Sequence, residues 1–311
     1  MFLAKKRSPT FGILTTPAKD IFHSNYHLGL LRGITPRIKS VGGRLKIIMM
    51  PSKPYQSLEQ ILDENGLDGL LILTWRWIHP EIARLIETSR HTRVLVVNDP
   101  VPGLRVNSVY ADIGAGMAQA VSHLVKRGRR KIGMLHGPWE VLFKEERNFL
   151  RGQAGTQCLT PGTARRKKVK VSFIDTQLKV RGFIRALKAK RVPCDQSWLR
   201  SGAANSEAEG YRVMKKWLRE NDLPEAILCG NDDLAFGALR ALKESGKTMA
   251  VIGFDDNDRA KTFSPPLTTV RQPLAQMGKD AVDILIRQIE RPASRPISKK
   301  YLPKLVIRKT A

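Results

Sequence analysis

Short apolar runs alternate with amphipathic stretches along most of this 311-residue chain. Residues 69–73 and 94–97 are apolar throughout, as is typical of strands buried on both faces of a parallel sheet. Between such runs, apolar residues recur at helical spacing, as in 113–125, where Asp112 is placed to cap the helix and Gly128 to end it. Further strands are expected at 11–14, 45–49, 131–135, 226–229, 250–254 and 302–307, and further helices at 26–41, 58–64, 80–88, 179–191, 206–220, 233–244 and 273–290. The alternation predicts an α/β fold of two doubly wound units.

Two segments interrupt this regular pattern. Pro36 falls inside the helix expected at 26–41 and should bend or interrupt it. From 139 to 177 the periodicity is lost, and a basic cluster spans 165–170. A connection of that length without elements is unusual in a compact domain, so three readings stay open: a mobile loop, a nucleic-acid patch or a corrupted stretch of reading frame.

Charge is the compositional anomaly of the chain. Lys and Arg number 54 against 28 Asp and Glu, giving a formal net charge of +26. Such a balance favours nonspecific contact with nucleic acid, although a solvated basic surface is the simpler alternative. Cys158, Cys194 and Cys229 are far apart, so we expect no disulfide framework, no zinc site and no other cofactor. Without a secretory signal or an apolar span, the chain is predicted to be cytoplasmic and free of membrane contact.

Polar side chains follow three of the expected strands, where ligands bind in open α/β sheets. Asp99 comes after the strand at 94–97, Asn231 after 226–229, and Asp255 after 250–254. Each of them alone suits helix capping. Together they suit a polyhydroxylated ligand, because carboxylates accept from adjacent hydroxyls and an amide both donates and accepts. No complete nucleotide-binding, hydrolase or metalloprotease motif is present, so we expect no enzyme.

Several ordered motifs resemble the effector-binding core of LacI/GalR-type bacterial transcription regulators. They are residues 107–112 (NSVYAD), 129–133 (RRKIG), 231–239 (NDDLAFGAL), 251–256 (VIGFDD) and 265–273 (PPLTTVRQP). The resemblance extends from Ser8 to Arg308 except for the region 139–177.

The resemblance implies a type I periplasmic-binding-protein-like fold, with two lobes joined by three crossovers. An N-terminal lobe would comprise 9–110 and 270–290, and a C-terminal lobe 111–269 and 291–311, with 139–177 as an insertion. It further implies that ligand binding in a cleft between the lobes closes them and changes a homodimer's grip on operator DNA. Effector contacts would come from Tyr26, His27, Asp99, Lys179, Asn231 and Asp255, with Lys179 replacing the family's arginine.

The resemblance also implies a helix-turn-helix ahead of this core. Residues 1–8 are expected to be a basic leader, the remnant of a linker, and 1–10 are too few for a helix-turn-helix. The chain is therefore predicted to be the sugar-sensing core of a regulator that reads its operator only through a domain outside these residues. The alternative is a stand-alone or periplasmic solute-binding protein.

Overall fold

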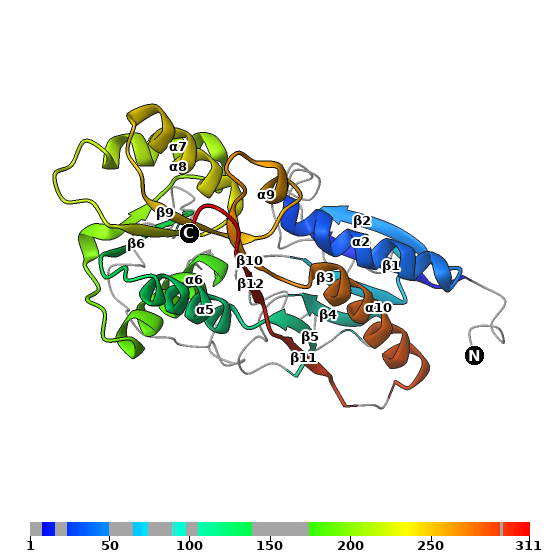
Figure 1. Ribbon diagram of the computed structural model, residues 1–311. Helices are drawn as coiled ribbons and strands as arrows, with labels where there is room; N and C mark the ends of the chain where they lie inside the picture. Colours follow the sequence, from blue (N-terminus) through cyan, green and yellow to red (C-terminus); the bar gives the residue numbers. More distant parts are fainter. Residues whose placement is uncertain are drawn as a thin grey trace, which may run out of the picture. The chain divides into compact units, whose positions relative to one another are not determined.

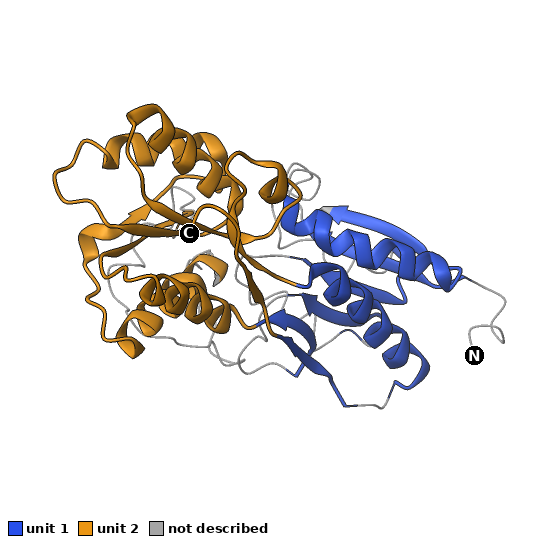
Figure 2. Ribbon diagram, in the orientation of Figure 1, with its two compact units in different colours: residues 1–111, 142–171, 273–301 blue, residues 112–141, 172–272, 302–311 orange. Residues whose placement is uncertain are grey.

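The computed structural model describes residues 8–15, 24–49, 65–73, 89, 91–97, 105–138, 174–292 and 295–311. The chain divides into two compact units (Figure 2). Unit 1 comprises 1–111, 142–171 and 273–301, and unit 2 comprises 112–141, 172–272 and 302–311. Among the described residues, the chain passes between the units after Ala111, Gln272 and Tyr301.

Unit 1 is built on a parallel sheet with the strand order β11-β5-β4-β3-β1-β2. In its centre Ile13 pairs with both Ile47 and Leu71, and the side chains of Ile13 and Leu71 are fully buried. The strands are β1 (Thr10–Thr15), β2 (Arg44–Met49), β3 (Gly69–Ile72), β4 (Arg93–Val97), β5 (Asn107–Ala111) and β11 (Ser298–Tyr301). Because the central strands β1, β3 and β4 are buried almost throughout, helices must cover them; two helices that pack on this sheet are α2 (Asn25–Ser40) and α10 (Leu274–Glu290) (Figure 1).

Helices α2 and α10 pack closely because glycines stand where they meet. A Cβ atom on Gly33 would lie 1.8 Å from the Ala275 carbonyl oxygen, and one on Gly278 would lie 2.2 Å from that of Leu30. Pro36 lies inside α2, yet the helix continues to Ser40, so the predicted interruption is wrong. Burial of one face of α2 against α10 outweighs the single backbone hydrogen bond that proline removes.

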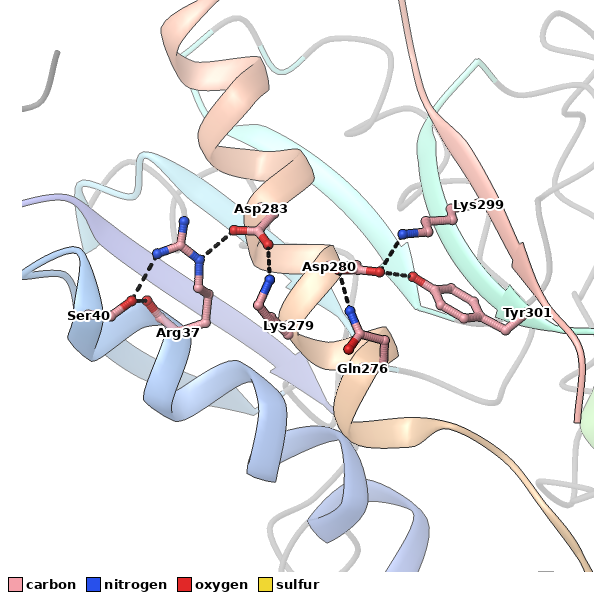
Figure 3. Close-up of polar contacts among 8 residues, drawn as sticks. All are labelled: Arg37, Ser40, Gln276, Lys279, Asp280, Asp283, Lys299 and Tyr301. Carbon is pink, nitrogen blue, oxygen red and sulfur yellow. Dashed lines mark hydrogen bonds and ion pairs between the residues drawn. The ribbon is translucent and has the colours of Figure 1, made fainter. Parts of the chain in front are cut away.

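Two carboxylates of α10 tie unit 1 together (Figure 3). Asp280 accepts hydrogen bonds from Lys299 Nζ at 2.5 Å and Tyr301 Oη at 2.5 Å, both on β11. Asp283 pairs with Arg37 of α2 and with Lys279 of its own helix. The returning helix is thereby attached to both the edge strand β11 and the neighbouring helix α2.

Unit 2 is built on a second sheet, with the order β12-β10-β9-β8-β6-β7. Its neighbouring strands are parallel except at β12, which runs antiparallel to β10. Helices α5 and α6 pack together on one face, and α7 and α8 on the other (Figure 1). The strands are β6 (Ile132–His136), β7 (Leu199–Ser201), β8 (Ala226–Cys229), β9 (Ala250–Asp255), β10 (Thr268–Arg271) and β12 (Lys304–Val306); the helices are α5 (Ile113–Lys126), α6 (Ile174–Ala189), the 3-10 turn η2 (Gln196–Trp198), α7 (Glu207–Trp217), α8 (Asp232–Ser245) and α9 (Arg259–Thr262).

The predicted caps of α5 are confirmed. The side chain of Asp112 accepts from the Ala115 backbone N–H at 2.9 Å, and Gly128 adopts φ = +80° just after the helix. Strands β5, β7, β10 and β11 were not predicted as strands. The helices expected at 58–64 and 80–88 lie outside the described residues.

Two predicted boundaries are wrong. Residues 298–301 form β11, which pairs with β5 of unit 1, so the segment 291–311 does not belong to the second lobe as a whole. Helix α6 begins at Ile174, so 174–177 are helical and not part of an irregular insertion. An ion pair between Asp175 and Lys179, one turn apart, stabilises this first turn. The rest of the expected insertion, 139–173, lies outside the described residues.

No helix in the described part of the chain is both long enough and apolar enough to cross a membrane.

Candidate functional site

Polar side chains gather at the carboxyl ends of the unit 2 strands. Strands β6, β8 and β9 are neighbours in the sheet and parallel, so their last residues meet at one edge. His136 ends β6, Asn231 follows β8, and Asp255 ends β9. Lys179 projects from the first half of α6, which begins at the same edge because it follows β6. This edge is the candidate site of unit 2.

Asp255 is the most unusual residue of this edge. Its backbone adopts φ = +108°, a conformation that costs a non-glycine residue about 1–3 kcal/mol. Its carboxylate accepts from Gln272 Nε2 at 2.8 Å. Burial raises the pKa of Asp255 to about 7, against the opposing influence of the Lys179 ammonium. A strained backbone and a desolvated carboxyl group are both features of binding sites.

Lys179 is held among carboxylates and an aromatic ring. Its side chain is 5% exposed, its Nζ donates to Asp175 Oδ2 at 2.7 Å, and it lies 4.5 Å from the centre of the Phe254 ring. Burial lowers the pKa of Lys179, but the nearby carboxylates of Asp175 and Asp255 raise it more, so the net shift is upward. The ammonium therefore stays charged and offers donors at a fixed position.

Asn231 is already engaged within unit 2. Its Oδ1 accepts from the Leu234 backbone N–H at 2.9 Å, which caps helix α8, and its Nδ2 donates to the Asn205 carbonyl at 3.2 Å. The capping role that Asn suits at a helix start is therefore real. Since an amide group carries two donor hydrogens, a contact with a ligand remains a prediction for Asn231.

Two further acidic residues, Asp232 after β8 and Asp256 after β9, support the structure around the site. Asp232 is 1% exposed and accepts from the Asn257 backbone N–H at 2.7 Å and from Thr269 Oγ1 at 2.5 Å. Burial and the neighbouring Asp255 raise the pKa of Asp232 well above its usual value. Asp256 accepts from Arg271 at 2.5 Å and from Arg308 at 2.6 Å. Both side chains therefore fix the loop that follows β9.

Sequence reasoning missed three polar contributors to this edge. His136 ends β6, with its Nδ1 2.7 Å from the Gly137 carbonyl oxygen, and burial lowers its pKa, so the ring is neutral at pH 7. Asp175 stands four residues before Lys179, a spacing that signals an ion pair on a helix. Gln272 follows β10, a strand that was itself not predicted.

The predicted ligand residues of unit 1 are only partly described. His27 is 1% exposed, and its Nε2 lies 3.3 Å from the Leu73 carbonyl oxygen. The half-buried Tyr26 meets the His27 ring edge-on, with centroids 5.8 Å apart. Asp99 lies outside the described residues. The ligand roles of these three residues therefore remain predictions, as do those of Lys179 and Asp255.

Among the described residues, no group of three or more His, Cys, Asp or Glu side chains is arranged to hold a metal ion. The amide, imidazole, carboxyl and ammonium groups at this edge of unit 2 suit hydrogen bonding to a small polar molecule.

The raised pKa of Asp255 makes stability depend on pH. Because its folded pKa of about 7 lies above the ordinary value of 3.8, the folded state binds more protons between those limits. The contribution of Asp255 to the free energy of unfolding therefore falls as pH rises from 4 to 7. Asp255→Asn is expected to flatten this dependence and to stabilise the chain at pH 8 by about 1–3 kcal/mol.

Urea denaturation between pH 4.5 and 8 measures this difference. Asp222→Asn, at a side chain that is 59% exposed, is the matched control and should leave the dependence unchanged. If the free energy of unfolding depends on pH in the same way in the wild type and in Asp255→Asn, the pKa of the Asp255 carboxyl is not raised.

Comparison with known proteins agrees with this architecture. The periplasmic binding protein-like domain family matches residues 121–311. The chain belongs to this family. The repressor PurR of Haemophilus influenzae (strain PittEE), an HTH-type transcriptional repressor, is 29% identical over 243 residues, which cover 77% of this chain and 62% of that protein. The chain thus spans less than two thirds of the length of the curated relatives that it matches first.

Solved structures share the fold at low sequence identity. The transcriptional regulator CelR in complex with cellobiose superposes with a TM-score of 0.78 at 20% identity, covering 100% of this chain and 88% of that one. The lac repressor dimer bound to operator and the anti-inducer ONPF gives a TM-score of 0.76 at 22% identity, covering 100% and 96%. The predicted fold class and the resemblance to LacI/GalR regulators are confirmed.

Proposed function

We propose that the chain is the ligand-sensing core of a LacI/GalR-type transcription regulator and that unit 2 binds a sugar-like effector at the carboxyl ends of its strands. The observation that carries the proposal is Asp255, which ends β9 with a strained backbone and a desolvated carboxyl group beside Lys179. The adjacent Asp256 already anchors the loop through two arginines, so anchoring of the loop does not by itself account for the strained backbone of Asp255.

The charge balance of this edge favours a neutral, hydroxyl-rich effector. Lys179 is already paired with Asp175, and Asp255 and Asp232 have raised pKa values. An anionic ligand would meet carboxylates, whereas sugar hydroxyls can donate to Asp255 and accept from Lys179. The cellobiose complex of the structural relative CelR is consistent with this choice.

The regulator assignment rests on the relatives named above, of which PurR and the lac repressor are repressors by name. In this proposal, effector binding closes the two lobes and thereby changes the DNA affinity of a cytoplasmic homodimer that is not an enzyme. A ligand can shift such an equilibrium only through different affinities for the two states. Operator recognition would come from a helix-turn-helix outside these residues.

A ligand screen tests the proposal. Melting temperatures of the purified chain are measured with a panel of monosaccharides, disaccharides including cellobiose, and sugar phosphates, and each hit is titrated by calorimetry. A neutral sugar should raise the melting temperature, because a ligand that binds only the folded state stabilises it. Stabilisation by sugar phosphates alone would contradict the choice of a neutral effector. Absence of any hit across the panel would contradict sugar sensing.

A further inference from the structure

A cluster of basic side chains occupies the other edge of the unit 2 sheet, where its strands begin. The last residue of α5 and the segment that joins α5 to β6 supply four of them, and the last turns of α6 and the residues after it supply four more. All eight are exposed. They are Lys126, Arg127, Arg129, Arg130, Arg185, Lys188, Lys190 and Arg191, and together we call them the basic edge.

The topology of unit 2 brings the two segments together. Helix α5 leads into β6 and α6 leads towards β7, and these two strands are neighbouring and parallel. The two helices also pack against each other on the same face of the sheet (Figure 1). Lys131 precedes β6 and Trp198 precedes β7, and Lys131 Nζ lies 5.8 Å from the centre of the Trp198 ring. This contact connects the starts of the two strands. The basic edge is therefore one surface.

The acidic side chains of the same edge are too few to neutralise it, and two of them pair with basic residues outside the basic edge. Glu225 accepts from the backbone N–H groups of Arg130 at 2.8 Å and Lys131 at 3.3 Å, Asp222 pairs with Lys131, Glu220 pairs with Arg200, and Asp195 caps η2. Within the described part of the chain, none of the eight basic side chains forms an ion pair. Glu225 also attracts Arg129 electrostatically, so the carboxylates offset part of the charge, but the eight basic side chains leave the basic edge strongly positive.

Helix ends alone do not account for this charge. The negative end of a helix dipole favours a cation in the last turn, but the effect fades within that turn. Arg129 and Arg130 lie beyond α5, and Lys190 and Arg191 lie beyond α6. Mutual repulsion among eight neighbouring charges is unfavourable, so the arrangement suits an anionic partner.

We propose that the basic edge binds double-stranded nucleic acid through its phosphates, without reading sequence. Five of its eight side chains are arginines, whose planar forks suit bidentate phosphate contacts. A membrane surface fits less well, because binding there needs apolar side chains to insert; of the large exposed apolar residues in the described part, only Ile184 lies on α5 or α6. This contact goes beyond the proposed function, since it needs neither effector nor helix-turn-helix.

Fluorescence anisotropy with a short mixed-sequence DNA duplex, titrated at several salt concentrations, tests the proposal. The variant K126Q/R127Q/R129Q/R130Q is compared with the wild type, and R185Q/K188Q/K190Q repeats the test on the second segment. The control K39Q/K261Q/K304Q/K309Q makes the same change in net charge as the first variant, at exposed lysines outside the basic edge.

The first variant is expected to bind DNA at least about tenfold more weakly at low salt, with a salt slope smaller by about 2–4. The DNA affinity of the control should fall by less than about threefold, because only its net charge has changed. Equal losses in variant and control would overturn the proposal, because affinity would then follow net charge and not this surface. Lack of DNA binding by the wild type, or binding to acidic protein or anionic vesicles but not to DNA, would overturn it as well.

Discussion

Asp255→Ala is expected to weaken effector binding by about a hundredfold or more. A desolvated carboxylate that accepts from ligand hydroxyls contributes about 1.5–3 kcal/mol per hydrogen bond, and two such bonds correspond to at least this loss. The substitution also leaves the ammonium of Lys179 with fewer carboxylates around it. Calorimetric titration with the best sugar from the ligand screen measures the change.

Two comparisons make this result specific. Asp222→Ala removes an exposed carboxylate at the opposite edge of the sheet and should keep the wild-type affinity. Asn231→Ala should reduce affinity by a smaller factor, because the amide is shared with the α8 cap and Asn205. If Asp255→Ala folds normally and binds the sugar with unchanged affinity, the effector must bind elsewhere.

Gly237→Ala is expected to destabilise unit 2 by about 3 kcal/mol or more. A Cβ atom at Gly237 would lie 2.1 Å from the Glu207 carbonyl oxygen and 2.4 Å from the Tyr211 backbone nitrogen. Both obstacles are backbone atoms of α7, so relief requires moving the whole helix away from α8. Thermal and urea denaturation measure the loss.

Gly114→Ala is the matched control for this substitution. Gly114 is an exposed helical glycine of α5, and its added Cβ would only approach Asp112 Oδ1 at 3.5 Å, an ordinary contact. Alanine there should be neutral or stabilising by about 0.5–1 kcal/mol, because it lowers the entropy of the unfolded chain. Equal effects of the two substitutions would contradict close packing of α7 on α8.

Much of the fold could be predicted because the central strands of both sheets are apolar and buried along most of their length. The run at Ala226–Cys229 and its polar successor Asn231 identify both a buried strand and the edge where ligands bind. Helix caps such as Asp112 could also be predicted, because the capping hydrogen bond joins a side chain to a backbone N–H only three residues later.

Contacts between distant residues could not be read from local patterns. Strand β5 is half polar, and its strand conformation depends on backbone pairing with β4 and β11. Strand β11 is exposed and lysine-rich, so its sequence does not indicate a strand. Asp255 accepts from Gln272, whereas Asp256 pairs with Arg271 and Arg308. These partners lie at least 15 residues away in sequence, so the different roles of the two aspartates cannot be predicted from local spacing. Propensity and spacing do not carry such information.

The most direct test of the central claim is a crystal structure of the chain with the best-binding sugar. We predict that ligand hydroxyls lie within hydrogen-bond distance of the Asp255 carboxylate and the Lys179 ammonium, at the carboxyl ends of β6, β8 and β9. A sugar bound at full occupancy that touches neither side chain would contradict the account.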